Sequence, residues 1–393
     1  MGRSGASVEG RQASIDAEGC VHARIESATC RSCVEVCPRR AWQLDDDGLT
    51  LDPARCDGCG LCVAACPTAA IAAPRGEPIR RQVGTRRVLL AACEYALPEA
   101  GQGCVTCLHA VSVSDLLRHW RQGERAWLVL TADCAACPRG RGVGFSSRIE
   151  WVNELLRARG EPTIQVKAIS AALWLGLRQG RDKSLHDRRG FLRRLLQRPV
   201  GTMSGQSQAE DSTTDRQPPG LYLTGRGPLP WTIRLDPQAC VACHACIRVC
   251  PTAALRMEGD TTAGTNPHGL CAAPEDESAV ASHEASLTPN PSPRGGGELR
   301  ESAYADFNLK ARYRLLHERC TGCGICVDVC AFQAIRLLPW SRPEMEDLPL
   351  KTFRCKDCGA DCKAPVMPGA KADICWVCMR NRTARRLYQV LEG

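Results

Sequence analysis

The sequence predicts an α+β chain assembled from several small modules rather than from one large domain. The 393 residues include 27 cysteines but only 5% aromatic residues, so one large apolar core is not expected. The cysteines gather in two similar arrays, near residues 20–66 and 240–330, which indicates a duplicated unit. Between the arrays, strand-like and helix-like stretches alternate, as is typical of a small α/β domain.

Composition and motif positions divide the chain into five parts. In chain order, we expect a first cysteine-bearing module over residues 1–80, an α/β domain over 86–175, a basic helix with a disordered linker over 176–230, a second cysteine-bearing module over 231–340 and a cysteine-bearing tail over 350–393. An insertion at 258–303 interrupts the second module, and it is tolerated because the entropy of loop closure rises slowly with length. Cys271 lies in this insertion without a partner at metal-ligand spacing, and we interpret it as a free thiol.

The central segment has the periodicity of a parallel α/β domain. Its apolar runs and amphipathic stretches predict strands at 87–92, 126–130 and 163–169, and helices at 114–120 and 149–158. Strands that alternate with helices in this way predict a parallel sheet.

Three of the four cysteine motifs have the spacing Cys-x2-Cys-x2-Cys-x3-Cys. They are Cys56, Cys59, Cys62 and Cys66, followed by Pro67; Cys240, Cys243, Cys246 and Cys250, followed by Pro251; and Cys320, Cys323, Cys326 and Cys330, followed by Ala331. Three thiolates two residues apart wrap one face of a 4Fe-4S cubane, and the fourth leads to a neighbouring cluster. Zinc is the alternative for any Cys-x-x-Cys pair, but four cysteines in one short run fit cubanes better than a zinc ribbon.

The first motif departs from this spacing. Cys30, Cys33 and Cys37 are in place, with Pro38 after them, but the leading cysteine is Cys20, with nine residues before Cys30. We expect Cys20 to complete the set. The alternatives are a three-iron cluster or another ligand, such as His22.

With these motifs, both arrays resemble the dicluster ferredoxin domain of bacteria. The resemblance implies a pseudo-twofold (βαβ)2 fold with a hairpin beside each cluster, and residues 41–51 have the pattern of such a hairpin, with its turn at 45–48. It also implies crossed ligation, in which the last cysteine of each motif binds the cluster of the other motif. The implied sets are Cys20, Cys30, Cys33 and Cys66; Cys56, Cys59, Cys62 and Cys37; Cys240, Cys243, Cys246 and Cys330; and Cys320, Cys323, Cys326 and Cys250.

Two further cysteine groups lie outside the arrays. The tail contains two Cys-x-x-Cys pairs, Cys355 with Cys358 and Cys375 with Cys378, and sixteen residues lie between the pairs. This is the pattern of a zinc ribbon, and it predicts structural zinc. The nearby Cys362 is either a packed side chain or part of a further iron-sulfur site. In the central domain, five cysteines fall at or beyond the ends of expected strands, where α/β folds place their sites: Cys93, Cys104, Cys107, Cys134 and Cys137.

The central segment resembles the iron-sulfur delta subunit of methyl-viologen-type hydrogenase and heterodisulfide reductase complexes. The likeness rests on the order of the cysteines and the strand pattern. It implies a 2Fe-2S cluster and transfer of electrons between enzymes. Reduced structural cysteines or zinc are the alternatives.

The sequence contains none of the motifs that would indicate a catalytic centre. There is no Gly-rich dinucleotide loop after a strand, no phosphate loop and no plausible hydrolase triad. We therefore expect a non-catalytic electron-transfer protein, or an electron-transfer subunit, whose partner is a catalytic oxidoreductase. The alternatives are an assembly factor for a metalloenzyme, with structural clusters, and an enzyme that uses the central cysteines on a thiol or disulfide.

Charge and hydropathy bear on location and partners. The net charge of +8 is weak evidence for nucleic acid, because bound clusters add negative charge, and we expect no such partner. The N-terminus is polar and no run of 18 apolar residues occurs, so we expect a cytoplasmic chain without a transmembrane segment. The stretch 187–193 resembles a twin-arginine export motif but lacks the apolar region after it. We interpret residues 181–198 as a solvated basic helix face, with docking of an acidic redox partner as the alternative.

Overall fold

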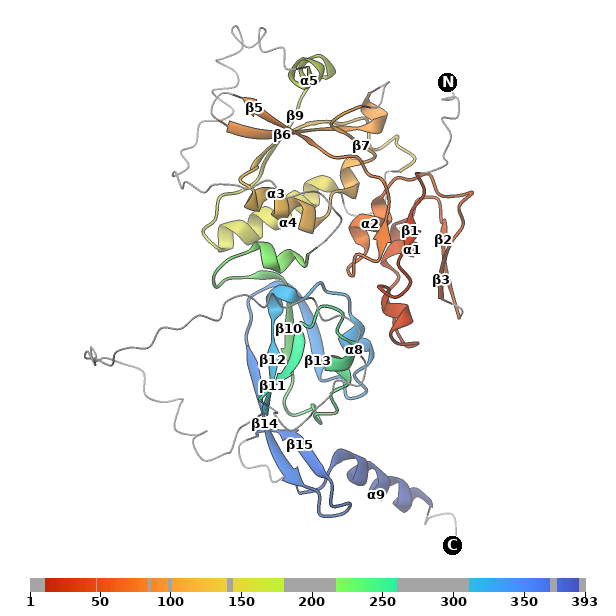
Figure 1. Ribbon diagram of the computed structural model, residues 1–393, viewed down its shortest axis with the longest axis vertical. Coiled ribbons are helices and arrows are strands. Elements are labelled where there is room, and N and C mark those ends of the chain that lie inside the picture. The colour runs from red at the N-terminus through yellow and green to blue at the C-terminus, as the bar shows by residue number, and fades with distance from the viewer. Residues whose placement is uncertain are drawn as a thin grey trace, which may run out of the picture. The chain divides into compact units, whose positions relative to one another are not determined.

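Figure 1 shows a computed structural model of the chain. The structure describes residues 11–46, 48–83, 86–97, 101–139, 144–179, 217–259, 311–367 and 373–388. The chain divides into two compact units, Met1–Arg256 with Arg314–Asp347, and Met257–Tyr313 with Leu348–Gly393. Both cysteine arrays and the central domain belong to the first unit, and the cysteine pairs of the tail belong to the second.

The first module repeats the order strand, helix, strand twice. Its elements are β1 (Ser14–Ile15), η1 (Val21–Ala23), α1 (Ser32–Val36), β2 (Trp42–Asp45), β3 (Gly48–Leu51), α2 (Leu61–Ala65) and β4 (Ile71–Ala72). β2 and β3 form an antiparallel hairpin, which confirms the hairpin expected there. β1 pairs antiparallel with β4, so the two ends of the module meet. Trp42, 3% exposed, packs with Cys33 and Cys62 in the core.

The central domain has a five-stranded sheet with helices on both faces (Figure 1). Its elements are β5 (Ile79–Val83), β6 (Arg86–Cys93), η2 (Glu94–Ala96), β7 (Cys104–Val105), η3 (Leu108–Ala110), α3 (Val113–Arg121), β8 (Ala126–Leu130), α4 (Phe145–Ala158), β9 (Gln165–Ala168) and α5 (Ala171–Arg178). β7, β8 and β9 continue the sheet from β6 in parallel, and β5 adds an antiparallel edge. The expected helices and strands are confirmed, and the antiparallel β5, the short β7 and the helix α5 are additions to them.

Two apolar clusters cover the two faces of this sheet. Leu116 of α3 and Val152 of α4 pack on the face that carries Leu89 and Cys93. Trp174 of α5, which is fully buried, packs on the opposite face. Because the parallel strands end at one edge, Cys93 at the end of β6 and the loop after β8 lie at the same edge of the sheet.

The second module has the same order of strands and α-helices as the first, whereas its 3-10 helices lie at other places. Its elements are η5 (Pro219–Tyr222), β10 (Leu229–Leu235), α7 (Ala245–Val249), β11 (Leu255–Glu258), β12 (Ala311–Leu315), η6 (His317–Arg319), α8 (Ile325–Asp328) and β13 (Ile335–Ser341). β10 pairs antiparallel with β13, as β1 does with β4. The insertion falls between β11 and β12, which are neighbours in one sheet, so it occupies the place of the turn in the β2–β3 hairpin.

His317 fixes the chain just before the last cysteine motif. The backbone N–H of Ile233 donates to its Nδ1 (3.0 Å), and its Nε2 donates to the carbonyl of Met345 (2.6 Å). Burial lowers the pKa of this imidazole. The ring is therefore neutral with its proton on Nε2, and it ties η6 to β10.

Four equivalent backbone hydrogen bonds connect the motifs in crossed pairs. In every motif an alanine stands four residues after the last cysteine, and its carbonyl accepts a 2.8 Å bond from the residue four positions before the first cysteine of the partner motif. The bonds are Asp52 N–H to Ala41, Asp16 N–H to Ala70, Leu316 N–H to Ala254 and Asp236 N–H to Ala334. Each of these alanines is at most 5% exposed. The end of each motif is thus held against the start of its partner.

Left-handed backbone conformations also recur at equivalent positions. The residue before each of these alanines has a positive φ of 49–58°: Arg40, Ala69, Ala253 and Gln333. In three of the four motifs, two further residues between the cysteines also have positive φ: Gly58 and Gly60, Ala242 and His244, and Gly322 and Gly324. Such conformations cost about 1 to 2 kcal/mol for a residue with a side chain. The loops therefore depend on tertiary contacts to hold their shape.

The central domain contacts both modules. From the first module, Arg75 donates to Asp115 (2.9 Å) and to the carbonyl of Ala110. Toward the second module, Arg159, which directly follows α4, donates to the carbonyls of Thr224, Gly225 and Pro228 at 2.6–2.8 Å. Leu223 and Leu229 bury their side chains in the core on the α4 side of the sheet.

The tail consists of two strands and a helix. They are β14 (Asp347–Arg354), β15 (Asp361–Pro365) and α9 (Trp376–Tyr388), and β14 pairs antiparallel with β15. Several expectations fall outside the described residues: most of the basic helix and linker, with the stretch 187–193, and most of the insertion, with Cys271. No helix in the described part of the chain has the length and hydropathy to cross a membrane.

A substitution pair tests the loop before α8. Gly322 and Gly324 both have φ near +80°, so replacing either with alanine costs about 1 kcal/mol. A Cβ at Gly322 would also collide with the indole of Trp231, whereas a Cβ at Gly324 meets nothing within 4 Å. Gly322→Ala should therefore lower the free energy of unfolding by about 2 kcal/mol more than Gly324→Ala, measured by urea denaturation. Equal losses would mean that Trp231 does not pack against this loop.

Candidate iron-sulfur and zinc centres

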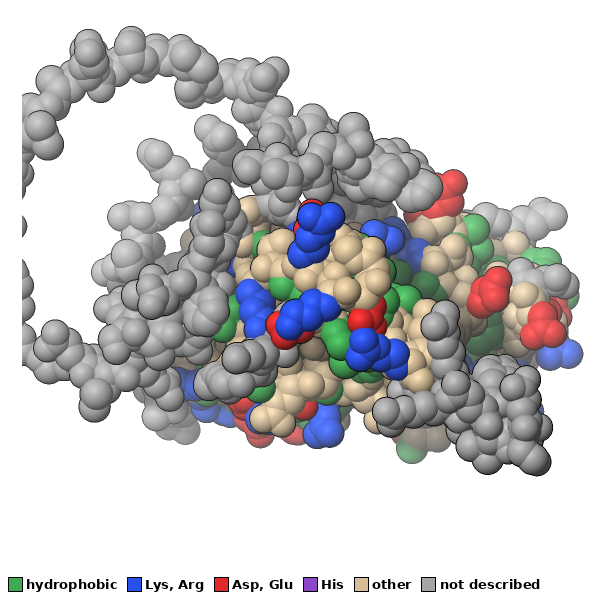
Figure 2. Space-filling view, turned by 90° about the horizontal axis from the view of Figure 1, so that it is seen from below, with side chains coloured by type: hydrophobic (Ala, Val, Ile, Leu, Met, Phe, Trp, Pro, Cys, Tyr) green, Lys and Arg blue, Asp and Glu red, His purple; other side chains and the backbone are tan. Residues whose placement is uncertain are grey.

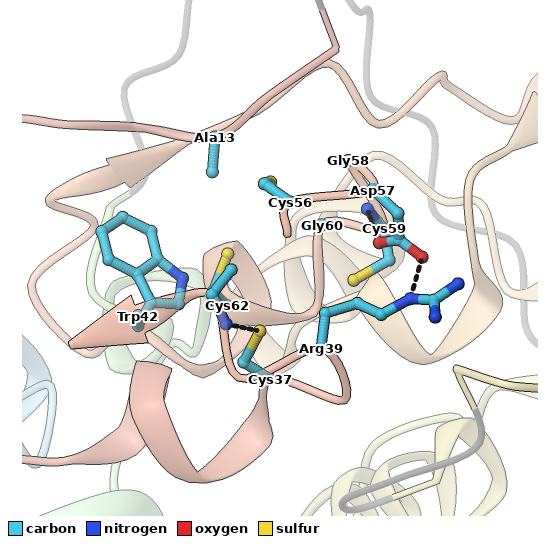
Figure 3. Close-up of a pocket in the computed structure, with 11 residues that line it drawn as sticks. Ala13, Cys37, Arg39, Trp42, Cys56, Asp57, Gly58, Cys59, Gly60 and Cys62 are labelled. Carbon is cyan, nitrogen blue, oxygen red and sulfur yellow. Dashed lines mark hydrogen bonds and ion pairs between the residues drawn. The ribbon is translucent and has the colours of Figure 1, made fainter. Parts of the chain in front are cut away.

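Four thiols from both motifs of the first array line one hollow (Figure 3). Three of them, Cys56, Cys59 and Cys62, come from the second motif, and Cys37 is the last cysteine of the first. Trp42 and Gly58 are among the other residues that line it. The structure therefore brings together the Cys56 group, by which we mean these four cysteines.

A second hollow in the same module holds the complementary set. Cys20, Cys30, Cys33 and Cys66 line it, and we call them the Cys20 group. His22 also lines it, but its Nε2 donates to the carbonyl of Cys30 (2.7 Å). The Cys20 thiol is close enough to Cys66 and Cys30 for their charges to add to the effect of burial, which raises its pKa. Cys20 is thus placed with the other three thiols despite its unusual spacing.

The second array forms two groups in the same crossed way. Burial raises the pKa of Cys246 to about 12, and the charges of Cys240, Cys243 and Cys330 contribute. Burial likewise raises the pKa of Cys320 to about 12, with contributions from Cys323 and Cys250. Cys326 lies within electrostatic reach of Cys320, Cys323 and Cys250 as well. We call these sets the Cys240 group and the Cys320 group; that their members bind metal stays a prediction.

Backbone N–H groups point at the sulfurs. The amides of Ala41, Ala254 and Ala334 donate to Cys37, Cys250 and Cys330 at 3.2–3.3 Å. Hydrogen bonds to cluster sulfurs and buried surroundings set the reduction potential of such centres. Three of the four alanines that join the motifs in pairs therefore also contribute to the electrostatics of the sites.

Burial holds the thiols in their protonated form. It raises the pKa of Cys33 and Cys59 to about 12 and that of Cys62 to about 11. A thiolate at these places is stable only when a cation balances its charge. Binding of iron at these groups must therefore release protons.

The central domain brings four of its five candidate cysteines together. Burial raises the pKa of Cys107 to about 11, and the charges of Cys93 and Cys137 add to this. The exposed Cys134 faces Cys93 and Cys137 in the same way. We call these four residues the central group.

Cys104 does not belong to the central group. In the β6–β7 pairing it lies opposite Ala92, and Cys93 lies opposite Val105. Neighbouring residues of a strand point to opposite faces, and Cys104 packs on the face that α5 covers. The expectation of five clustered cysteines thus reduces to four, because the register of β7 turns Cys104 away.

A buried arginine connects the central group to the Cys56 group. Arg139, with a side chain 6% exposed, pairs with Asp57 (3.0 Å) and Glu94 (3.1 Å). Burial alone would raise the pKa of Asp57, but Arg139 lowers it below the ordinary value. Cys107 also packs with Cys59 in one apolar cluster.

The two sites are therefore immediate neighbours. No sequence signal singles out Arg139, because its partners lie 82 and 45 residues away along the chain.

The tail cysteines have the geometry of a single-ion site. Among the residues that the structure describes, Cys355, Cys358, Cys375 and Cys378 are the one set of candidate ligands whose atoms all lie within 4.8 Å of one another. The sulfurs of Cys358 and Cys375 are 3.9 Å apart. A tetrahedron with Zn–S bonds of about 2.3 Å requires about 3.8 Å.

Backbone amides prepare one of these thiols for a cation. The N–H groups of Cys358 and Cys375 hold the pKa of the Cys355 thiol well below its ordinary value. Cys362 lies near this set but outside it, and its sulfur contacts the carbonyl of Ala360 at 3.5 Å.

The tail carries ion pairs at its surface. Lys356 bonds Asp373 at 2.6 Å, and Arg382 pairs with Asp357. Figure 2 shows one face of the molecule on which Lys and Arg side chains lie beside Asp and Glu side chains. On the described part of that face, basic and acidic side chains are therefore mixed, and the basic ones do not form a patch of their own.

Comparison with known proteins identifies the two arrays. A family model of the 4Fe-4S dicluster domain matches residues 28–70, and one of the 4Fe-4S binding domain matches residues 233–256 and 314–336. A pyruvate-flavodoxin oxidoreductase of Rhodospirillum rubrum is 36% identical over 95 residues, which cover 24% of this chain and 6% of that protein. The chain thus matches a small part of the length of this relative. It carries ferredoxin-type domains that bind 4Fe-4S clusters, as the resemblance of the arrays implied.

These matches leave parts of the chain uncovered. Neither family model reaches Cys20, the central domain or the tail. The resemblance of the central segment to a delta subunit has no counterpart in these matches.

Substitution of two arginines that share a carboxylate tests the connection between the sites. Arg139→Ala leaves Asp57 half-buried without its main partner, while Glu94 keeps its pair with Arg11 (2.9 Å), so the free energy of unfolding should fall by about 2 kcal/mol. Arg39→Ala removes a longer pair to Asp57 (3.5 Å) from a side chain 48% exposed, and should cost less than about 0.5 kcal/mol. Urea unfolding monitored by tryptophan fluorescence measures both. Similar losses would show that Arg139 does not hold the two sites together.

Proposed function

We propose that this chain is a one-electron carrier that serves as an electron-transfer protein or subunit of a cytoplasmic oxidoreductase complex. The observation that carries the proposal is the gathering of sixteen array cysteines into four groups of four, each reached by thiols from two motifs. A bound 4Fe-4S cluster takes up or releases one electron. The chain itself contributes buried thiols, N–H donors to the sulfurs, and apolar walls that keep water away.

The ligands proposed for each cluster are the members of one group. Cys20 is included because the Asp16–Ala70 hydrogen bond places it as the equivalent bonds place the first cysteines of the other motifs. His22 is left out because its Nε2 is bonded to the Cys30 carbonyl. The relative's name describes a redox enzyme that acts with flavodoxin, which supports a small redox protein or a catalytic oxidoreductase subunit as partner.

We also propose a 2Fe-2S cluster in the central group and a structural zinc ion in the tail. Among the described residues, only the tail cysteines have sulfurs that all lie within 4.8 Å of one another. The sulfurs of the central group are therefore more widely spaced than one tetrahedral ion requires. Two iron atoms bridged by sulfide suit that wider spacing. The tail set suits zinc, and with four thiolates it leaves no open position for catalysis.

Metal analysis with EPR tests the main proposal. Protein purified without oxygen should contain about 16 iron atoms in the arrays, about 2 in the central group and about 1 zinc atom. Reduction with dithionite should give EPR signals of interacting clusters that disappear on reoxidation.

Two results would contradict the proposal. Zinc in the arrays would exclude an electron carrier. Clusters that form but cannot be reduced reversibly would favour the assembly-factor alternative.

A cysteine pair tests the central cluster separately. Cys134 is exposed, so Cys134→Ser should leave the fold intact while the chain loses about 2 iron atoms. Cys104→Ser is the matched control, because Cys104 lies on the opposite face of the sheet, and its iron content should stay unchanged. Iron and sulfide per chain are the measurement. Equal iron content in both variants would mean that the central group holds no cluster.

A further inference from the structure

Two residues from different arrays meet directly. The backbone N–H of Thr29 donates to Oδ2 of Asp328 (2.8 Å), and its hydroxyl donates to Oδ1 (2.9 Å). One carboxylate is therefore bound at both oxygens by one residue 299 positions away in the sequence. Both residues belong to the first compact unit.

These residues are adjacent to cluster ligands on both sides. Thr29 directly precedes Cys30 of the Cys20 group, and consecutive Cα atoms are about 3.8 Å apart. Asp328 ends α8, between Cys326 of the Cys320 group and Cys330 of the Cys240 group. The contact therefore brings the edges of two cysteine groups from different arrays next to each other.

The electrostatics of the thiols agree with this proximity. The Cys323 side chain lies within electrostatic reach of both Cys250 and Cys30. Cys250 belongs to the same group as Cys323, whereas Cys30 belongs to the other array. Cys30 and Cys323 are thus near neighbours across the contact.

The unusual spacing of the first motif coincides with this contact. The nine residues between Cys20 and Cys30 contain η1 and end at Thr29. The loops of the other three motifs have a pair of left-handed residues instead, which keeps them short. The longer loop is therefore the part of the first module that reaches the second array.

Both modules are also fixed to the central domain independently of this contact. The Thr106 hydroxyl donates to the carbonyl of Cys59 (3.0 Å) on one side. On the other side, Trp151 of α4 packs against Trp340 of β13 with ring centres 5.9 Å apart. Each module therefore contacts the central domain, and the Thr29–Asp328 bonds add a direct contact between the two modules within the first unit.

We propose that Thr29 and Asp328 join the two arrays into one electron path, with the Cys20 and Cys320 groups as consecutive sites. This inference rests on the proposed electron-transfer function. The order of sites is then the central group, the Cys56 group, the Cys20 group, the Cys320 group and the Cys240 group. Thr29 and Asp328 act as positioning residues.

Each step along this path would move one electron from the cluster held by one group to the cluster held by the next. The donor cluster would be oxidised and the acceptor cluster reduced by one electron, and no bond or proton would change place. One-electron carriers of the ferredoxin or flavodoxin class supply and remove the electron at the ends. Because electron tunnelling falls steeply with distance, a looser contact between the arrays slows the step between them.

The test uses the full-length protein with its clusters. Asp328→Ala removes both hydrogen bonds, and Thr29→Val removes the hydroxyl bond alone. Glu344→Ala is the matched control, because it removes one acidic charge from the same module at an exposed pair with Arg234. Iron content should be the same in all four proteins, and the reduction potentials are measured in each so that a change in driving force is distinguished from a looser contact.

Two measurements then examine the junction. Pulsed EPR of the fully reduced wild-type protein should show magnetic coupling between arrays as well as within them, and Asp328→Ala should lose the coupling between arrays. On mixing with oxidised flavodoxin, the wild-type and Glu344→Ala proteins should release their electrons in one phase. Asp328→Ala should release about half of them in a second phase about tenfold slower, the factor that about 1.4 kcal/mol represents. Thr29→Val should fall between.

The outcomes separate this inference from the function on which it rests. If the wild-type clusters are reduced reversibly but show no coupling between arrays, or if Asp328→Ala releases its electrons like the wild type, the single path is wrong while the carrier function stands. If the wild-type clusters cannot be reduced reversibly, the proposed function itself fails.

Discussion

The structure depends on the four equivalent hydrogen bonds that cross between cysteine motifs. Each joins the alanine after one motif to the residue that precedes the partner motif, at 2.8 Å in every case. The spacing of a four-cysteine run separates the last cysteine from the first three. The crossed bonds hold that last cysteine at the partner's hollow, and this makes two sites of mixed origin from each pair of motifs.

This constraint also explains why small modules suffice. The core of the first module includes the ligands themselves, since Cys33 and Cys62 pack with Trp42. With so few aromatic residues, apolar burial alone gives such a module little stability. The bound clusters then contribute to folding, and the raised pKa values of Cys33 and Cys59 indicate that thiols without metal stay protonated. Arg139 offsets the carboxylates that the same crowding brings together.

Spacing in the sequence predicted much of the fold and of the sites. The hairpin at β2–β3 and the ends of β6 and β8 were predicted because each depends on local order along the chain. The grouping of the array thiols was implied by the resemblance to the dicluster domain. The alanine four residues after every last cysteine was readable in the sequence as well, and its role became apparent only with the hydrogen bonds. Cys104 was misplaced with the central group because the face it occupies depends on how β7 pairs with β6.

Contacts between distant residues could not be predicted in this way. Arg139 finds Asp57, and Thr29 finds Asp328, through the packing of whole modules. No local pattern marks either pair as partners. These contacts nevertheless decide which sites are neighbours, and hence whether the chain holds separate centres or a connected series.

Anomalous X-ray diffraction from crystals of the intact protein, at the iron and zinc absorption edges, tests the central claim most directly. We expect iron at each of the four array groups, with each site bounded by thiols of two motifs, and zinc in the tail alone. Iron sites bounded by the four cysteines of a single motif, or zinc at the array groups, would contradict it.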